Sequence, residues 1–330
     1  MQTSVAFYGI DRSRPIQLSL MLLLIMELVL PASGAAPPGE STSQYSRMSA
    51  SRIKQLRRAM KSVAELHQPM EKPQAGDWLA SFPEKGQTFA EYLRCQPTLP
   101  DANRSTIYIQ PLGEFSDSQL KIVSITAEYM QLFFHLPVVL QKEMPLPELP
   151  EKAKRIHPEW NTPQIQSLYL LSDVLKPMLP DDAAALIAFT TNDLYPNEKM
   201  NFVFGQASLQ DRVGVWSLHR FGDPDESDED YRLCLLRTLK VSTHETGHMF
   251  SMKHCTKYEC NMSGSNHLRE TDSRPLDVCP ECMAKICWGM KYDPLERYEK
   301  LAEFCKTHEL TEESEFFQAE ADAVRSVYGR

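Results

Sequence analysis

The spacing of hydrophobic positions alternates between two periods from Ser105 onward. Short segments rich in Val, Ile and Phe predict strands, whereas longer segments with an apolar stripe at helical spacing predict helices. The predicted strands are residues 105–110, 136–142 and 184–191, and the predicted helices are residues 118–134 and 162–175. Residues 184–191 have no polar interruption before the final threonines, which is typical of a central strand buried on both faces. This alternation predicts an α/β sheet.

Two more strands and a long helix follow along the chain. Residues 201–209 and 212–221 each alternate apolar with polar positions, as the strands of a hairpin with one exposed side do. Because a hairpin is antiparallel, the predicted sheet is mixed. Residues 231–250 contain no Pro and no early Gly, and leucines recur along one side, which predicts a single helix through His248.

Helical patterns also occur on both sides of the predicted sheet region. These segments are residues 51–68, 77–94, 293–308 and 312–329. The first is amphipathic, with basic residues opposite its apolar face, and the second is mixed and predicts short helical turns that pack on the main domain. The last two should close the domain, and Asp293 and Thr311 stand where helix caps are expected.

The first 36 residues have the layout of a secretory signal. Two arginines precede an apolar stretch from Ile16 to Leu30, and small residues follow it. The stretch is shorter than the roughly 20 residues that a membrane span needs, and no second span occurs. We expect cleavage near Gly34 or Ala36 and export to the periplasm or the exterior. Glu27 interrupts the apolar run. The alternatives are an uncleaved anchor, or a mis-assigned start, in which case the protein would be cytoplasmic.

The composition defines the class of protein and the division of the chain. The 330 residues are 42% hydrophobic, enough to bury a core, and the net charge is −9 with no long basic run. A nucleic-acid partner is therefore not expected. We expect a signal peptide in residues 1–36, a Pro- and Ser-rich linker with a helical extension in residues 37–104, and one main domain in residues 105–330.

The stretch HETGHMFSMKHC, residues 244–255, concentrates groups that bind metals. His244 and His248 are four positions apart, so on one helix both imidazoles lie on the same face and can bind a single ion. Glu245 projects at a different angle, where it cannot complete the coordination but can take a proton from an attacking water. This division of roles suits peptide hydrolysis, because zinc polarises the carbonyl and lowers the pKa of water from 15.7 to about 7.

A third histidine extends the motif. His254 can join the same ion only if the helix ends soon after Met249 and the chain then turns. Three neutral nitrogens would leave a fourth position open, as catalytic zinc sites do. The pattern resembles the extended motif of the metzincins, HExxHxxGxxH, except that Ser251 stands at the position of the turning glycine. Either Ser251 adopts the left-handed conformation at a cost of roughly 1–2 kcal/mol, or Met252 shares the turn, or His254 is displaced and the zinc site is weak.

Four cysteines after the motif suit a second, structural zinc site. They are Cys255, Cys260, Cys279 and Cys282. Four thiolates close a tetrahedral coordination sphere. Neighbouring side chains in extended backbone point to opposite sides, so His254 and Cys255 can face two different metals. The alternative, in an oxidising compartment, is a redox pair formed by Cys279 and Cys282.

Together these motifs resemble the archaemetzincin family. The resemblance covers roughly residues 105–301 and rests on residues 192–196, 201–209, 244–255, 260–268 and 274–287. It implies an α/β, metzincin-like zincin with a mixed twisted sheet, an active-site helix and a zinc-braced C-terminal subdomain. It also implies two Zn²⁺ ions per chain, one catalytic with Glu245 as general base and one structural, and an aminopeptidase-like preference. Met262 is similarly placed to the methionine of the Met-turn beneath the catalytic metal.

The expected function is therefore zinc-dependent hydrolysis of a peptide or protein substrate. Residues 201–209 could align the substrate backbone by strand addition. A competing hypothesis is a zinc-stabilised binding protein that has lost turnover, and a weaker one is an interaction module in which only the four cysteines matter. Glu245 favours an enzyme, because a carboxylate that is not a ligand has no use in a binding module. The oligomeric state leaves no trace in the sequence.

The other histidines and cysteines are expected to have ordinary roles. His135, His157, His219 and His267 are interpreted as surface or core residues that do not bind metal. Cys95, Cys234, Cys287 and Cys305 are interpreted as isolated thiols, with Cys234 as a small core residue on an apolar helix face. A disulfide between two of these four is the alternative in an exported protein.

Overall fold

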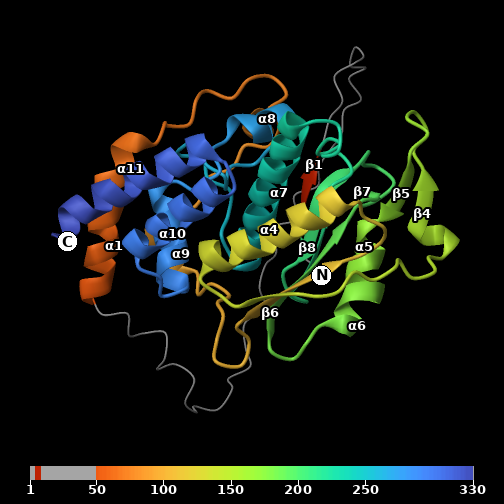
Figure 1. Ribbon diagram of the computed structural model, residues 1–330, viewed down its shortest axis with the longest axis horizontal. Helices are drawn as coiled ribbons and strands as arrows, with labels where there is room; N and C mark the ends of the chain where they lie inside the picture. Colours follow the sequence, from red (N-terminus) through yellow and green to blue (C-terminus); the bar gives the residue numbers. More distant parts are fainter. Residues whose placement is uncertain (1–3, 9–49, 330) are drawn as a thin grey trace.

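The structure, a computed structural model, describes residues 4–8 and 50–329. The apolar stretch of the predicted signal, Ile16 to Leu30, and the predicted linker at residues 37–48 lie outside the described residues. The mixed sheet lies at one end of the molecule, and a group of helices that contains the C-terminus lies at the other (Figure 1). None of the helices in the described part is long and apolar enough to cross a membrane.

The sheet has nine strands in the order β3-β2-β6-β9-β8-β7-β5-β4, and β1 pairs separately with β8. The strands are β1 Ser4–Tyr8, β2 Thr106–Pro111, β3 Val138–Leu140, β4 Lys154–Ile156, β5 Pro163–Gln166, β6 Ala183–Thr190, β7 Asp193–Tyr195, β8 Val203–Ser208 and β9 Val213–Ser217. β3, β2, β6 and β9 run parallel, whereas β8 is antiparallel to β9, β7 and β1. The predicted mixed α/β sheet is therefore confirmed.

β6 is the central strand that the sequence predicts, and all its residues are buried. Ile187 and Phe189 pack into the core beneath the long helices, and Leu186 and Ala188 pack into a second core on the opposite face. The expectation that β8 and β9 expose one side is wrong, because every residue of both strands is buried. Residues 167–178 cover that face. The polar Gln206 of β8 is held there by the hydroxyl of Ser167.

The segment predicted as one helix at residues 162–175 has a different structure. Its first residues form β5, which pairs with β4 and β7. The helical part follows as α5 Ser167–Tyr169, the π-helical turn η4 Leu170–Leu175 and α6 Lys176–Met178. Ile165 is buried between its neighbouring strands, so sheet pairing overrides the local helical spacing.

Two long helices cover the face of the sheet that carries the site. α4 (Asp117–Phe134) begins at Ser116, which forms a capping box with Gln119. α7 (Asp228–Met249) begins at Ser227, whose side chain accepts the N–H of Asp230. The two helices pack against each other (Figure 1). The predicted helix through His248 is present, and it ends one residue later.

Most of the remaining helices form the group at the other end of the molecule (Figure 1). They are α1 Ala50–Val63, η2 Ala64–Leu66, α3 Phe89–Arg94, α9 Pro280–Gly289, α10 Pro294–Thr307 and α11 Thr311–Tyr328. The short helix α8 Leu268–Ser273 contacts α7, and α2 Trp78–Ser81 is hydrogen-bonded to α8. The short helix η3 Glu151–Ala153 directly precedes β4 in the sheet. α1 packs against α9 and α11, and its residues Leu56, Ala59 and Val63 are fully buried. α11 begins after Leu310, which offers no side-chain cap, so the expected cap at Thr311 is wrong.

A buried network of charged side chains ties the N-terminal extension to this helical group. Nε2 of His67 lies 2.8 Å from the carboxylate of Glu320 on α11. Arg297 on α10 donates to Asp277 at 2.7 Å, and one carboxylate oxygen each of Asp277 and Glu320 lie within 4.8 Å of each other. Burial and the nearby charge of Asp277 both raise the pKa of Glu320. His67, Glu320 and Arg297 thereby link three separate segments of the chain.

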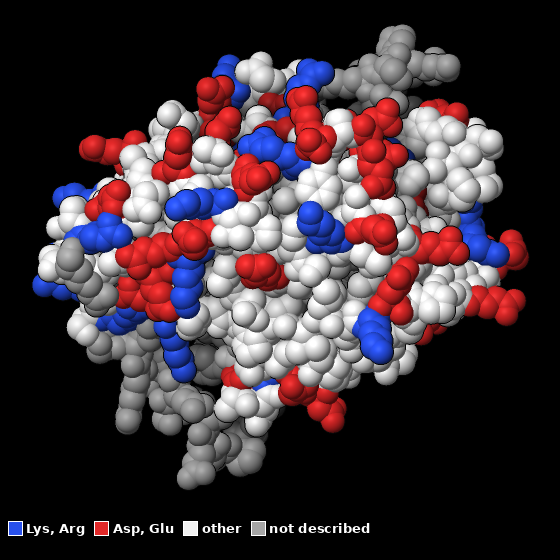
Figure 2. Space-filling model, in the orientation of Figure 1, with Lys and Arg blue, Asp and Glu red and all other residues white. Residues whose placement is uncertain are grey.

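Charged side chains of both signs are interspersed over the face shown in Figure 2. The acidic side chains lie beside basic ones in many places, as in the ion pairs Arg325–Glu299 and Lys300–Glu296. Exposed pairs of this kind contribute little to stability, about 0–1 kcal/mol each. The packing of the two cores, described above, holds the site in place.

Candidate metal centre

The last two turns of α7 place His244, Glu245 and His248 inside the protein. All three side chains are buried, with exposed fractions of 1%, 0% and 5%. His244 and His248 lie one helical turn apart, and their Nε2 atoms are 2.9 Å from each other. The spacing in the sequence therefore produces the shared face that it predicts.

Backbone carbonyls determine which nitrogen of each imidazole carries the hydrogen. Nδ1 of His244 lies 2.6 Å from the carbonyl oxygen of Asn261, and Nδ1 of His248 lies 2.6 Å from that of Met252. A carbonyl oxygen can only accept, so both Nδ1 atoms donate and both Nε2 atoms present lone pairs. Two lone pairs facing each other across 2.9 Å require a cation between them.

A proton is a poor candidate for that cation. Burial, followed by the charges of His248 and His254, places the pKa of His244 well below its usual value. Burial, followed by the charge of His254, lowers the pKa of His248 to about 3. Both imidazoles are therefore neutral at physiological pH, as metal ligands must be, and their donor atoms fit a zinc ion.

The chain turns immediately after α7 and returns His254 to the same point. Ser251 has a φ of 66°, in the left-handed region, and its N–H donates to the carbonyl oxygen of His248 at 2.8 Å. The centroid of the His254 ring then lies 4.8 Å from the ring centroid of His248 and 5.3 Å from that of His244. One donor atom from each histidine lies within 4.8 Å of the other two. Of the alternatives for the turn, Ser251 itself adopts the conformation usually taken by glycine.

Glu245 follows His244 on α7, and its carboxylate makes no hydrogen bond within the described part of the chain. Both carboxylate oxygens are buried and have no partner among the described residues. Burial raises the pKa of Glu245 to about 8. A carboxylate left without donors in an apolar position is costly, and such groups are concentrated at functional sites. Gly205 of β8 passes close by, since a Cβ built on it would lie 3.5 Å from Cγ of Glu245.

The four predicted cysteines also come together. Cys255, Cys260, Cys279 and Cys282 are buried, and their sulfur atoms all lie within 4.8 Å of one another. Sγ of Cys255 lies 3.6 Å from Sγ of Cys279, close to the roughly 3.8 Å that four Zn–S bonds of about 2.3 Å produce in a tetrahedron. All eight cysteines of the chain are free, so no disulfide joins Cys279 to Cys282.

Hydrogen bonds to sulfur strengthen this interpretation of the cysteine cluster. The N–H groups of Met262 and Cys279 donate to Sγ of Cys260 at 3.4 and 3.1 Å, as amides around a thiolate do. Hydrogen bonds from the other three thiols lower the pKa of Cys255, whereas burial raises the pKa of Cys260 and of Cys279 well above its usual value. The cluster by itself therefore favours one thiolate, and a bound zinc ion would favour deprotonation of the others.

Met262 packs against α7 near its C-terminal end. A Cβ built on Gly247 would lie only 2.7 Å from Sδ of Met262, so the thioether fills the space that a side chain at position 247 would take. The carbonyl oxygen of Met262 accepts the N–H of Cys255 at 2.7 Å. The methionine thus contacts α7 between His244 and His248, and its backbone carbonyl is hydrogen-bonded to the cysteine cluster.

The sequence analysis missed two residues of the site, Glu84 and Trp78. Both belong to the N-terminal extension. The carboxylate of Glu84 lies 2.9 Å from Nδ1 of His254, across a separation of 170 residues in the chain. Nε1 of Trp78 donates to the same carboxylate at 2.9 Å. No local motif marks either residue, because their proximity to His254 arises only from the path of the extension.

Other groups of histidines and carboxylates do not resemble metal sites. His67, Asp277 and Glu320 lie close together, but His67 is hydrogen-bonded to Glu320, and the guanidinium of Arg297 already places a positive charge beside Asp277. His267 caps α8, and its Nδ1 accepts the N–H of Glu270. The hydrogen of the neutral ring therefore lies on Nε2. A neutral histidine in that state has no lone pair left for a metal.

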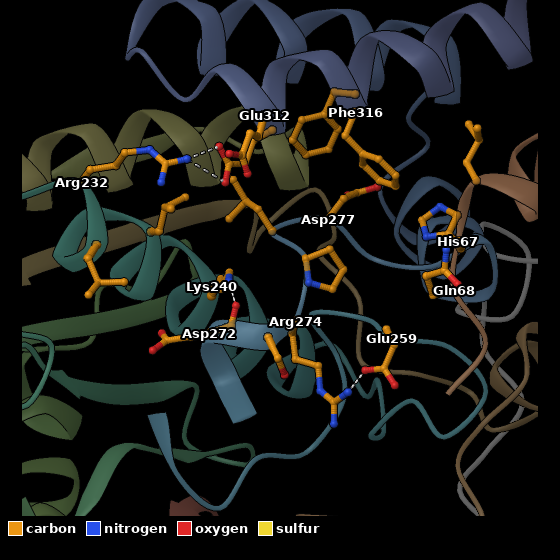
Figure 3. A pocket seen from close by; sticks show the side chains of 18 residues that line it. His67, Gln68, Arg232, Lys240, Glu259, Asp272, Arg274, Asp277, Glu312 and Phe316 are labelled. Atoms are coloured by element: carbon orange, nitrogen blue, oxygen red, sulfur yellow. Dashed lines mark hydrogen bonds and ion pairs between the residues drawn. The ribbon is translucent and has the colours of Figure 1, made fainter. Parts of the chain in front are cut away.

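A separate pocket of about 530 Å³ lies between the first turns of α7, α11 and residues 272–277 (Figure 3). Its lining includes none of the three histidines or Glu245. Two ion pairs join residues of its lining, Arg232 with Glu313 and Arg274 with Glu259. Figure 3 shows the second pair. The pocket is therefore not part of the metal centre.

Comparison with known proteins decides the family. The sequence model of peptidase family M54 matches residues 165–287. Archaemetzincin-2 from Homo sapiens is 32% identical over 295 residues, which cover 78% of this chain and 80% of that protein. The chain belongs to the archaemetzincin family. Archaemetzincin-2 from Pongo abelii matches with the same identity and coverage.

A solved archaemetzincin structure is also similar. The crystal structure of the protein from Methanopyrus kandleri aligns with a TM-score of 0.46 and 28% identity, and the match covers 58% of this chain and 98% of that one. As an archaemetzincin, the chain is a zinc metallopeptidase, a hydrolase that acts on peptides. The predicted family and the predicted class of enzyme are therefore confirmed.

Proposed function

We propose that this archaemetzincin hydrolyses peptide bonds at one zinc ion held by His244, His248 and His254, with Glu245 as the general base. The observation that carries the proposal is the pair of facing Nε2 lone pairs beside a buried carboxylate that has no hydrogen-bond partner in the described part of the chain. Such a set can bind a cation and retain one uncommitted base.

The roles of the residues follow from their hydrogen bonds. When bound, zinc supplies polarisation of the substrate carbonyl and a lowered pKa for the attacking water. The carbonyls of Asn261 and Met252 hold the imidazoles of His244 and His248 in the tautomer that presents Nε2. Glu245 accepts the proton of the attacking water and returns it to the leaving amine. The buried position of Glu245 keeps bulk water from competing for that proton.

We infer that β8 aligns the substrate backbone. Gly205 of β8 lies against Glu245, and β1 pairs antiparallel with β8 from Ser208 to Val203. The edge of β8 beside the site can therefore accept an extended chain. Peptides N-methylated at successive backbone positions test this inference. Methylation at alternate positions should lower kcat/KM about tenfold, the effect of one lost hydrogen bond. Equal rates for all the methylated peptides would contradict strand addition.

The four cysteines are proposed to hold a second, structural zinc ion. The support is the closed set of buried sulfur atoms, with no position left for water. We expect metal analysis of the purified protein to find two zinc ions per chain. One ion should resist exchange, because four thiolates bind zinc more tightly than three imidazoles. A single ion per chain would contradict this part of the proposal.

We also propose that the enzyme prefers to cleave at the amino terminus of peptides, as an aminopeptidase does. This specificity rests on the family resemblance. Paired peptides with a free or an acetylated amino terminus provide the test. Aminopeptidase-like activity should disappear with acetylation, because the first peptide bond is then no longer preceded by a charged amine. Equal cleavage of both peptides would show an endopeptidase instead.

Export of the protein is proposed on the layout of its first 36 residues. Removal of residues 1–36 would also remove β1 and leave the β8 edge open to substrate. The mass of the amino terminus of the protein isolated from its natural host tests the proposal. Cleavage near Gly34 or Ala36 supports export, and an intact amino terminus contradicts it.

Substitution of Glu245 is the decisive test of the proposed chemistry. Glu245→Ala should abolish hydrolysis of a peptide library and leave both zinc ions in place, because Glu245 is not a ligand. The loss expected for a missing general base is about 10²- to 10⁴-fold or more. Glu65→Gln, at an exposed position of the extension, serves as the control and should retain full activity. Hydrolysis that survives Glu245→Ala would refute the role of Glu245. Zinc binding without turnover in the wild-type protein would instead favour the zinc-stabilised binding protein.

A further inference from the structure

The N-terminal extension runs along the chain that carries the third histidine. Pro69 forms a β-bridge with Tyr258, and the N–H of Met70 donates to the carbonyl oxygen of Lys257 at 3.0 Å. Gly86 approaches so closely that a Cβ on it would lie 2.3 Å from the hydroxyl of Thr256. The extension is therefore fitted against the segment that follows the active-site helix.

The same extension delivers a carboxylate to His254. Both oxygens of Glu84 lie near Nδ1 of His254, at 3.0 and 2.9 Å. The carboxylate side chain is 32% exposed and the imidazole is 8% exposed, so this contact is partly shielded from water. Because a carboxylate only accepts, Nδ1 of His254 carries the hydrogen and Nε2 presents a lone pair to the other two histidines.

Trp78 holds Glu84 in this position. Its indole N–H donates to Oε1 of Glu84 at 2.9 Å, and its ring lies edge-on to His254 with centroids 5.0 Å apart. The indole is packed tightly, since a Cβ on Gly264 would lie 2.4 Å from it. The positions of carboxylate and imidazole are thus fixed by a buried aromatic side chain from the extension.

The three histidines differ in the acceptor that each one faces. His244 and His248 donate to backbone carbonyls, whereas His254 donates to a charged carboxylate. A hydrogen bond to a charged acceptor is stronger than one to a carbonyl. A carboxylate that accepts the Nδ1–H of a histidine also makes its Nε2 a better metal ligand. Loss of such a partner typically lowers metal affinity 10- to 100-fold.

We propose that Glu84 is a positioning residue for the third zinc ligand, His254. The N-terminal extension therefore contributes directly to zinc binding at the metal centre. The inference rests on the proposed histidine zinc site. Glu84 holds the ring of His254 in one orientation and one tautomer by accepting its Nδ1–H. His254 stands on a turn outside the helix, so it needs this restraint more than the two histidines on α7 do.

Other contacts of the extension agree with this role. The side chain of Gln87 donates to the carbonyl oxygen of Ser251 at 3.3 Å and accepts the N–H of Lys253 at 3.2 Å. The hydroxyl of Tyr92 donates to the carbonyl oxygen of Phe250 at 2.8 Å. The turn between His248 and His254 is consequently braced by the same segment that supplies Glu84.

Zinc retention measured against a chelator tests the proposal without reliance on turnover. Full-length wild type, Glu84→Ala, Glu84→Gln and the control Glu65→Gln are loaded with zinc and titrated with a chromophoric chelator. In Glu84→Ala we expect one zinc ion to be lost at a 10- to 100-fold lower chelator concentration, while the cysteine-bound ion is retained as in wild type. Glu84→Gln keeps an oxygen acceptor but loses its charge, and should lie between wild type and Glu84→Ala. Glu65→Gln should match wild type.

Each outcome of this titration is informative. Release of zinc from Glu84→Ala and Glu84→Gln at the wild-type chelator concentration would overturn the proposal. Equal weakening of both zinc ions in the variants would also overturn it, because that pattern indicates a general loss of structure. If Glu84→Ala fails to fold, the partial effect of Glu84→Gln decides the question. A wild-type protein that retains only the cysteine-bound ion would instead contradict the proposed histidine site, which is a different failure.

Discussion

Ser251 shows how one residue can depart from a motif and still preserve its geometry. It takes a left-handed conformation that costs an L-residue roughly 1–2 kcal/mol. Its hydroxyl oxygen accepts the N–H of Thr98 at 2.9 Å, a bond that glycine could not make. The serine thus offsets part of its conformational cost by tying the N-terminal extension to the turn.

Two substitutions separate these opposing effects. Ser251→Ala keeps the conformational cost and loses the hydrogen bond, so we expect it to lower the free energy of unfolding by about 0.5–1.5 kcal/mol. Ser251→Gly loses the same bond but removes the cost, so it should change stability by less than about 0.5 kcal/mol. Chemical denaturation of the zinc-loaded proteins measures both. Equal destabilisation by Ala and Gly would show that the left-handed conformation is not strained.

At the scale of single elements, helix starts illustrate where local signals suffice. Asp293 accepts the N–H groups of Leu295 and Glu296 at the start of α10, as its position before proline predicts. Thr311 matches a similar pattern, but it lies inside α11 rather than at its cap. The difference arises because Leu310 is buried and sets where the helix begins.

The two sites form a matched pair for a capping experiment. Asp293→Ala should lower the free energy of unfolding by about 1 kcal/mol, because two N–H groups lose their acceptor. Thr311→Ala should change it by less than about 0.5 kcal/mol, since that exposed side chain caps nothing. Thermal or chemical denaturation in parallel gives the comparison. A loss at Thr311 equal to the loss at Asp293 would contradict the assigned helix start.

At the scale of the whole molecule, the buried charges between the extension and the helical group set a dependence on pH. Burial, followed by the charge of Asp277, raises the pKa of Glu320 well above its usual 4.5. Burial lowers the pKa of His67 below 6.5. Folding therefore favours the protonated form of Glu320 and the neutral form of His67. The raised pKa of Glu320 contributes its full stabilisation below pH 4.5, and this contribution is lost as the pH rises. The lowered pKa of His67 destabilises the folded protein as the pH falls below 6.5.

Glu320→Gln removes one of these titrations and keeps an oxygen acceptor for His67. Its amide is neutral at every pH, so it does not repel the nearby carboxylate of Asp277. Between pH 5 and pH 7 we expect the stability of Glu320→Gln to rise relative to wild type by up to about 1.4 kcal/mol per pH unit. Glu320→Ala, which breaks the network, should be destabilised at both pH values. Urea denaturation at each pH measures the effect, and a constant difference between wild type and Glu320→Gln would contradict the protonated glutamate.

The sequence by itself determined the features that depend on neighbours along the chain. The face shared by His244 and His248 follows from helical periodicity, and the central strand β6 follows from its continuous apolar run. The burial of β8 and β9 was not predictable, because a strand does not reveal what will cover its second face. The same holds for β5, where pairing with other strands outweighed the helical spacing of residues 162–175.

Tertiary structure alone decided how the third histidine is held. The motif places His254 near the other two, but its hydrogen-bond partner Glu84 is 170 residues away in the chain. The contact between them depends on a loop path fixed by Trp78, Gly86 and the bridge at Pro69. Local spacing constrains only atoms that a few bonds connect, whereas contacts between distant segments arise from the packing of the whole chain.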